Sequence, residues 1–400
     1  MINSKTRPLS GLRILEMGSL IAGPFAAKTL GEFGAEVIKI EPPEIGDALR
    51  SWRTPAGTTS VWWHVQARNK KSVAIDLRQP EGQELVRKLA CEADVVIENF
   101  RPGTLEKWGL DYDTLAKLNP KLIMLRISGY GQTGPLRDLA GFGVIAEAMG
   151  GFRYITGMPG EAPVRPGISI GDSLSALHGV IGVMMALYHR VANGGQGQMI
   201  DVALYESVFN MMEGAVPEFD RYGMVREPAG SALQGVAPTN AYPCSDGLYV
   251  LVAGNNDQIF KRLMALVGRD DLGNDLRLAR NPGRVDHMEL IDQAIGEWTQ
   301  QHSLAEALTA LHEARVPAGK VFTIKDIVQD THYQARDMLR TIRLNDGSEL
   351  QVPGVVPKLS ATPGDFEGGG PDLGQHTEAV LASIGVDAAQ MNDLRQKGVI

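Results

Sequence analysis

Strand-like apolar runs alternate with helical patterns along the first 130 residues, and this alternation limits the folds open to the chain. Runs rich in β-branched residues predict buried strands, whereas apolar spacings of three and four predict helices between them. Strands that are joined by helices pair in parallel, because each connection must return to the same end of the sheet. We therefore predict an α/β fold with a doubly wound parallel sheet, whose strands fall at 11–18, 36–43, 71–77, 94–100 and 121–130.

The pattern changes after residue 130. Residues 173–192 predict a long, apolar and mostly buried helix, and residues 196–213 predict a strand that turns into a helix. The stretch 214–241 contains several prolines and glycines, so we expect an irregular linker there. Amphipathic helices follow and predict a separate, smaller α+β unit, and residues 340–354 predict a hairpin.

Composition excludes several classes of protein. The 400 residues carry 39 basic and 47 acidic side chains, a net charge of −8, so we expect no nucleic-acid partner. Cys91 and Cys244 are too few for a disulfide framework, and no metal-binding histidine spacing occurs, so we expect no metal. The polar first residues and the lack of an 18-residue apolar run predict a soluble, cytoplasmic protein without a membrane partner.

The turn after the first predicted strand, 18–24, is the first candidate ligand site. Glu41 ends the second strand, where a ribose-binding acid often lies in dinucleotide-binding proteins. The letters GSLIAG lack the middle glycine of that fingerprint, which disfavours NAD. A helix N-terminus that receives another phosphate or nucleotide stays open.

Two arginines follow neighbouring predicted strands. Arg78 comes directly after one strand and Arg101 after the next, with Lys107 a turn beyond. The carboxyl ends of parallel strands line one crevice, so both arginines are expected at the same edge. A solvated basic surface and a site for a phosphate-rich ligand are equally compatible with this pattern.

Asp172 is the candidate reactive carboxylate. It precedes the long apolar helix and is the only acid between residues 164 and 187. An aspartate in this place is most often a helix cap. A carboxylate at a helix N-terminus stays ionised, and Gly171 beside it leaves room for a ligand, so it is also a candidate nucleophile.

The chain resembles the class III CoA-transferases, which include formyl-CoA and carnitine CoA-transferases and are related to α-methylacyl-CoA racemases. The motifs that carry the resemblance are colinear over essentially the whole chain: GSLIAGP, ARNKKSVAIDLRQPEG, ADVVIENFRPGTLEKWGL, GDSLSALHG and GQGQMIDVALYES. The resemblance implies a Rossmann-like large domain built from both termini, a small α+β domain and an interlocked homodimer. It implies the domain bounds 1–220, 221–325 (linker and small domain) and 326–400 (return to the large domain).

The same resemblance implies an activity and a site. Asp172 would be the nucleophile that moves CoA from an acyl-CoA to a carboxylic acid, through aspartyl anhydrides and an aspartyl-CoA thioester. No permanent cofactor is implied, since CoA and acyl-CoA are substrates. The implied CoA-binding residues are Ile21, Ala22, Ile75, Asp76, Leu77, Arg78, Asn99, Phe100, Arg101 and Lys107.

Two side chains bear on substrate choice. The segment PVRPG, which contains Arg165, resembles the corresponding segment in the family members that use succinyl-CoA and dicarboxylic acids. Arg165 would pair with the second carboxylate of such an acid, and a purely structural role is equally compatible. Phe142 stands where related racemases have a histidine, which disfavours racemase or epimerase activity. Two alternatives to a CoA-transferase remain: an acyl-CoA racemase or epimerase of the same superfamily, and a non-catalytic acyl-CoA-binding protein.

Overall fold

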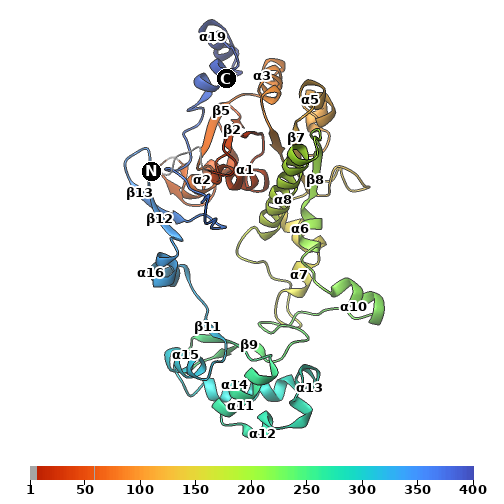
Figure 1. The fold of residues 1–400 in the computed structure, drawn as a ribbon, viewed down its shortest axis with the longest axis vertical. Helices are drawn as coiled ribbons and strands as arrows, with labels where there is room; N and C mark the ends of the chain where they lie inside the picture. The colour runs from red at the N-terminus through yellow and green to blue at the C-terminus, as the bar shows by residue number, and fades with distance from the viewer. Residues whose placement is uncertain (1–6, 58) are drawn as a thin grey trace. The chain divides into compact units, whose positions relative to one another are not determined.

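The structure is a computed structural model that describes residues 7–57 and 59–400. It contains two compact units (Figure 1): the first holds the chain up to Phe152 with Pro166–Glu213 and Gln334–Ile400, and the second holds Arg153–Arg165 and Gly214–Tyr333. The domain bounds 1–220, 221–325 and 326–400 stay a prediction. The units differ from it in grouping Arg153–Arg165 with the smaller part.

The first unit is built on one six-stranded sheet. Its strands lie in the order β5 (Lys70–Ala74), β2 (Glu36–Glu41), β1 (Arg13–Glu16), β6 (Val95–Glu98), β7 (Ile123–Ser128) and β8 (Met199–Ala203). Every pair is parallel; Leu15 on β1, for example, lies opposite Ile38 and Val96. This confirms the predicted α/β class with a parallel central sheet.

Helices cover both faces of this sheet, because successive strand residues point to opposite sides. On one face, α1 (Ala22–Glu32) and α8 (Ile170–Ala192) pack on Ile14, Val95 and Leu125. On the other face, Leu15, Val96 and Met124 meet α3 (Pro80–Cys91), α5 (Tyr112–Leu118) and the C-terminal helices α18 (Thr377–Ser383) and α19 (Ala388–Gln396). Residues from the chain's far end thus complete the core of the first unit.

Helix α8 differs from its sequence prediction at its start. It begins at Ile170, so Asp172 lies inside its first turn rather than ahead of it. Its Gly179 packs directly on Leu125, and its Gly182 on Ile200, as close packing requires. With 23 residues and a mean hydropathy of 1.5, α8 has the length and composition of a membrane span. In the structure, however, it packs against β7 and β8 on one face of the central sheet (Figure 1).

Shorter elements complete the first unit. They are η2 (Ala48–Ser51), β3 (Pro55–Ala56), β4 (Thr59–Ser60), α2 (Val61–Gln66), α4 (Thr104–Trp108), α6 (Gly143–Met149), α7 (Phe152–Ile155, which crosses into the second unit), α9 (Leu204–Phe209), and the strands β12 (Leu339–Arg343) and β13 (Glu349–Pro353). The last two strands form the hairpin predicted at 340–354.

The second unit is an antiparallel sheet with helices. Strands β9 (Thr239–Pro243), β10 (Tyr249–Ala253) and β11 (Ala318–Lys320) pair with β10 in the centre. Its helices are α10 (Ala215–Tyr222), α11 (Asp257–Leu266), α12 (Asp270–Gly273), η3 (Leu276–Leu278), α13 (Asn281–Asp286), α14 (Met288–Thr299), α15 (Leu304–Glu313) and α16 (Ile324–Gln329), with α17 (Thr331–Ala335) leading out. The linker expected at 214–241 is wrong in part, since α10 and the start of β9 lie within it.

Candidate functional site

The sheet order places a ligand crevice at one point. Strand order runs outward in opposite directions from β1 and β6, and ligands of open α/β sheets bind beyond the carboxyl ends of such a pair. Here those ends carry Ser19 and Asn99. The Asn99 amide accepts from the Ser19 N–H at 2.8 Å and donates to the Ser19 carbonyl at 2.9 Å, joining the two segments.

A cavity of about 380 Å³ lies at this edge. Five of the ten residues predicted to bind CoA line it: Ile75, Asp76, Leu77, Arg78 and Phe100. Gly18 and Ser19 of the candidate turn 18–24 line it as well. Its walls also contain residues that the sequence analysis did not select: Met17, Lys39, Ile40, Pro42, Ile45, Gly46, Asp47, Ala48 and Trp108. Apolar walls with a few charged groups suit a ligand that has an aromatic base and phosphates.

The other five residues predicted to bind CoA do not line the cavity. Ile21 and Ala22 are buried at the start of α1, and Asn99 holds Ser19 as described. Arg101 and Lys107 are exposed beyond the end of β6. Their contacts with CoA, like those of the cavity residues, stay predictions.

Arg78 is oriented by its own neighbour. Its guanidinium donates to both carboxylate oxygens of Asp76, at 2.8 and 2.9 Å, while its side chain stays 80% exposed. These hydrogen bonds hold the pKa of the Asp76 carboxyl below its usual value. A preorganised, solvent-facing guanidinium at the cavity rim is suited to an anionic ligand.

Glu41 does not have the free carboxylate that a ribose ligand needs. Arg50 donates to both of its oxygens at 2.8 Å, and the Ser72 hydroxyl donates to it at 2.6 Å. Burial raises the pKa of Glu41, but the hydrogen bonds from Arg50 and Ser72 and the charges of Lys39 and Arg50 together outweigh burial and leave the pKa lowered. The dinucleotide interpretation weighed for this strand end therefore finds no support in the structure.

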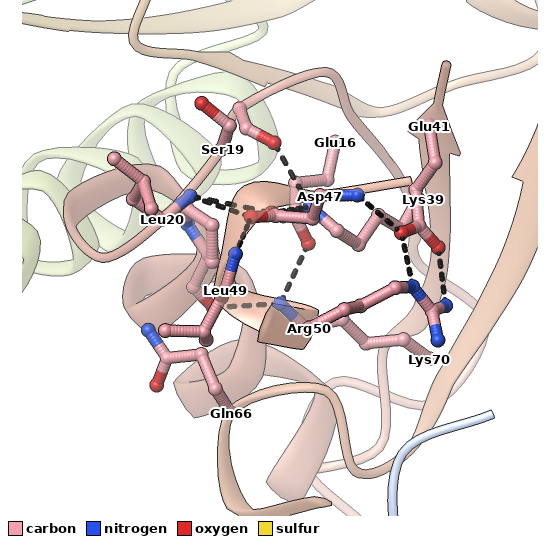
Figure 2. A network of polar contacts seen from close by, with 12 residues as sticks. Glu16, Ser19, Leu20, Lys39, Glu41, Asp47, Leu49, Arg50, Gln66 and Lys70 are labelled. Carbon is pink, nitrogen blue, oxygen red and sulfur yellow. Dashed lines mark hydrogen bonds and ion pairs between the residues drawn. The ribbon is translucent and has the colours of Figure 1, made fainter. Parts of the chain in front are cut away.

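A buried charged cluster, which the sequence analysis missed, lies under the turn 18–24 (Figure 2). Lys39 contacts Glu16 and Asp47, each at 2.8 Å, and Lys70 contacts Glu16 at 2.7 Å. All four side chains are at most 1% exposed. One signal for it was available: Lys39 is a lysine within the apolar strand VIKI, where a charge requires a partner.

Asp172 is half-buried in the first turn of α8, beside the first residue of α6. A Cβ on Gly143 would overlap the Asp172 carboxylate, so only glycine leaves that space. A Cβ on Gly171 would come within 3.2 Å of the Gly143 carbonyl and 3.3 Å of Glu147 Cγ. Glu147, fully buried here, is a neighbour that the sequence did not single out.

The two candidate substrate residues lie in different units. Phe142 precedes Gly143 and is 64% exposed, so its ring is free to meet a ligand near Asp172. Arg165 is exposed and belongs to the second unit. No cluster of metal-ligating side chains occurs among the described residues.

Comparison with known proteins defines the class. Residues 9–377 match CoA-transferase family III. The chain is 46% identical over 396 residues to succinyl-CoA–D-citramalate CoA-transferase of Chloroflexus aurantiacus, covering 98% of each chain. It is 37% identical to succinate–glutarate CoA-transferase of Agrobacterium fabrum, covering 94% of this chain and 96% of that one.

Solved structures agree. A CAIB/BAIF family protein from Brucella suis has a TM-score of 0.83 at 34% identity, covering 95% of this chain and 100% of that one. Rv3272 from Mycobacterium tuberculosis has a TM-score of 0.82 at 27% identity, covering 93% and 99%. The chain therefore belongs to CoA-transferase family III, which confirms the resemblance drawn from its motifs. It is a CoA-transferase, an enzyme whose CoA thioesters are substrates rather than a permanent cofactor.

Proposed function

We propose that this enzyme transfers CoA from succinyl-CoA to a short dicarboxylic acid, with Asp172 as the nucleophile. The observation that carries the proposal is the set of relatives at 37–46% identity, which are named as succinyl-CoA or succinate CoA-transferases for citramalate, malate and glutarate. They match this chain over at least 94% of its length, so the likeness includes both units.

The first half of the reaction loads CoA onto the enzyme. The Asp172 carboxylate attacks the thioester carbonyl of succinyl-CoA, which forms a mixed anhydride and releases CoA thiolate. The thiolate attacks the aspartyl carbonyl of the anhydride, which forms an aspartyl-CoA thioester and releases succinate.

The second half repeats these steps in reverse order. The acceptor carboxylate attacks the aspartyl thioester, which forms a new anhydride and releases the thiolate. The thiolate then attacks the acceptor's acyl carbon, which yields the acceptor's CoA thioester and restores the Asp172 carboxylate. Each step exchanges one acyl bond for another, with no net proton transfer and no oxidation.

The position of Asp172 supports this role. It lies in the first turn of α8, where the helix dipole favours the negative charge of a nucleophilic carboxylate. Gly143, which has no side chain, leaves the space that the Asp172 carboxylate occupies. The mixed anhydrides are prone to hydrolysis, so the site must exclude water while they exist.

A trapping experiment tests the nucleophile. The enzyme is mixed with succinyl-CoA and then with hydroxylamine, and peptide mass spectrometry locates the hydroxamate. We expect the modification on Asp172, and an Asp172→Asn variant that binds CoA but neither transfers it nor becomes modified. Normal turnover by Asp172→Asn, or a hydroxamate on another residue, would contradict the proposal; binding without turnover by the wild type would favour a non-catalytic acyl-CoA-binding protein.

The acceptor class has its own test. We propose that Arg165 pairs with the second carboxylate of a dicarboxylic acid, since a guanidinium matches a carboxylate with two hydrogen bonds. Arg165→Gln should raise KM for malate, citramalate or glutarate about tenfold or more and leave that for a monocarboxylic acid unchanged. Unchanged dicarboxylate kinetics would remove Arg165 from the substrate site.

We also propose that the protein forms an interlocked homodimer and is located in the cytoplasm. Each chain would be divided into the domain segments 1–220, 221–325 and 326–400. One face of α8 exposes Ile181, Met185, Tyr188 and Val191, and a second copy would cover these side chains. The malate transferase relatives are named as alpha and beta subunits, so self-association needs its own measurement. Light scattering should give twice the chain mass of 43.2 kDa; a monomer would contradict the proposal.

A further inference from the structure

The turn 18–24 has a backbone that needs support. Leu20 has a φ of +63°, in the left-handed region that costs a residue with a side chain conformational energy. Gly18 and Ser19, on the same turn, line the cavity. Such a conformation persists only when the surrounding groups hold it in place.

Two buried lysines bind the ends of the turn. The Lys39 ammonium donates to the Gly18 carbonyl at 2.9 Å, and the Lys70 ammonium donates to the Pro24 carbonyl at 2.7 Å. Lys39 comes from β2 and Lys70 from β5, so two neighbouring strands fix the two ends.

Two further side chains bind the middle of the turn. The Asp47 carboxylate accepts from the Leu20 N–H at 3.0 Å (Figure 2). The Gln66 amide donates to the Ile21 carbonyl at 3.0 Å. Asp47 also caps the short helix η2 by accepting from the Leu49 N–H. The left-handed residue of the turn is thus held directly by a buried carboxylate.

The charges of the cluster compensate one another. Glu16 lies between Lys39 and Lys70, and Asp47 completes the group, so two carboxylates face two ammonium groups away from solvent. Buried ion pairs contribute little net stability compared with apolar residues of the same volume. Their geometric specificity is the better explanation for their presence, and here Lys39, Lys70 and Asp47 each make a further hydrogen bond to the backbone of one turn.

We propose that this cluster, defined as Glu16, Lys39, Asp47, Gln66 and Lys70, positions the turn 18–24 for CoA, so that CoA affinity depends on buried residues at and behind the cavity wall. The proposal rests on the proposed function, in which the cavity beside the turn receives CoA. The cluster members are positioning residues; Lys39 and Asp47 reach the cavity wall, whereas Glu16, Gln66 and Lys70 lie behind it. A preformed turn binds its ligand without first having to be ordered.

The first test removes one charge of each sign. The variant Lys39→Met/Asp47→Leu keeps the cluster neutral and releases the Gly18 carbonyl and the Leu20 N–H. We expect Kd for CoA and KM for succinyl-CoA to rise at least tenfold, with kcat at saturation changed less than threefold. A proportionate loss of kcat with unchanged KM would contradict a role in positioning the CoA turn.

A matched control separates this effect from general destabilisation. Arg68 and Glu32 form another buried pair in the same unit, and Arg68 donates to the Pro353 carbonyl at 2.7 Å rather than to the turn. Arg68→Met/Glu32→Leu should lower the free energy of unfolding by a similar amount and leave Kd for CoA within twofold. A tenfold weakening of CoA binding in this control would overturn the proposal.

A milder variant and a ligand-free measurement keep the test decisive if the double variant does not fold. Gln66→Met removes one hydrogen bond without altering charge, and it should speed amide hydrogen exchange at Ser19 and Leu20 and raise Kd for CoA about threefold. Unchanged exchange together with unchanged Kd would refute the positioning role. Wild-type enzyme that binds no CoA would instead refute the proposed function. The amide exchange rates at Ser19 and Leu20 would still show whether the cluster stabilises the turn.

Discussion

Gly143 and Asp172 occupy the same small space at the start of α6 and α8: a single methyl group on Gly143 would overlap the Asp172 carboxylate. Glycine at position 143 therefore leaves the space that the Asp172 side chain occupies. This relationship joins residues 29 positions apart in the chain and bears directly on the proposed nucleophile.

Gly143→Ala should leave the fold intact and displace the carboxylate. Alanine favours a helical position, so the free energy of unfolding should not fall, whereas Asp172 must rotate away from the new methyl group. A reacting group moved by about 1 Å can lose about 10²-fold in rate, and kcat should drop by that order. Gly167→Ala is the control, since nothing lies within 4 Å of its added carbon; equal kcat in the two variants would refute the steric argument.

Arg78 should contribute to CoA affinity through charge. Arg78→Gln removes the guanidinium that Asp76 orients at the cavity rim, and Kd for CoA at low salt should rise about tenfold. The loss should shrink at high ionic strength, because exposed charges are screened. Titration calorimetry with CoA and with CoA lacking its 3′-phosphate would show which phosphate is involved.

The control for Arg78 is Arg277→Gln, which removes an exposed guanidinium that likewise pairs with an aspartate two residues before it, Asp275, but belongs to the second unit and lies outside the cavity wall. It changes the net charge equally and should leave CoA binding unaltered. Identical weakening in both variants would mean that only the overall charge matters.

Asn99 should affect CoA binding through Ser19. Asn99→Ala removes both hydrogen bonds to the Ser19 backbone, so the turn loses its link to β6 and Kd for CoA should rise about tenfold. Asn119→Ala is a fair comparison, since the Asn119 amide also donates to backbone carbonyls, those of Ala90 and Ala93, but outside the cavity wall. Equal CoA affinity for wild type and Asn99→Ala would show that the link is dispensable.

Buried His64 should make stability depend on pH. Burial lowers the pKa of His64 from its usual value of 6.5, so the folded state resists protonation that the unfolded state accepts. The free energy of unfolding should therefore fall as pH drops from 6.5 toward 5, and His64→Gln should flatten this slope. Urea unfolding at several pH values measures it, with the exposed His332→Gln as control; identical slopes for wild type and His64→Gln would contradict the prediction.

The local pattern of apolar and polar residues was sufficient to predict most of the architecture of the first unit. The strands β1, β2, β5, β6 and β7 and the long helix α8 are visible in the spacing of apolar residues, because each buries one face or both. The colinear motifs were sufficient for the family. The helix α10 was missed because its proline and the glycines around it resemble a linker, and α8 began earlier than its apolar run.

Other features depend on contacts between distant segments. No local signal pairs Lys39 with Asp47 and Lys70 with Glu16, or directs these side chains to the carbonyls of one turn. The sequence by itself determined the family, the alternation of the main strands and helices, and the candidate nucleophile Asp172. Only the tertiary structure decided which charges meet beneath the turn and which glycine makes room for the nucleophile, because burial makes a charge or a methyl group costly only once the chain has packed around it.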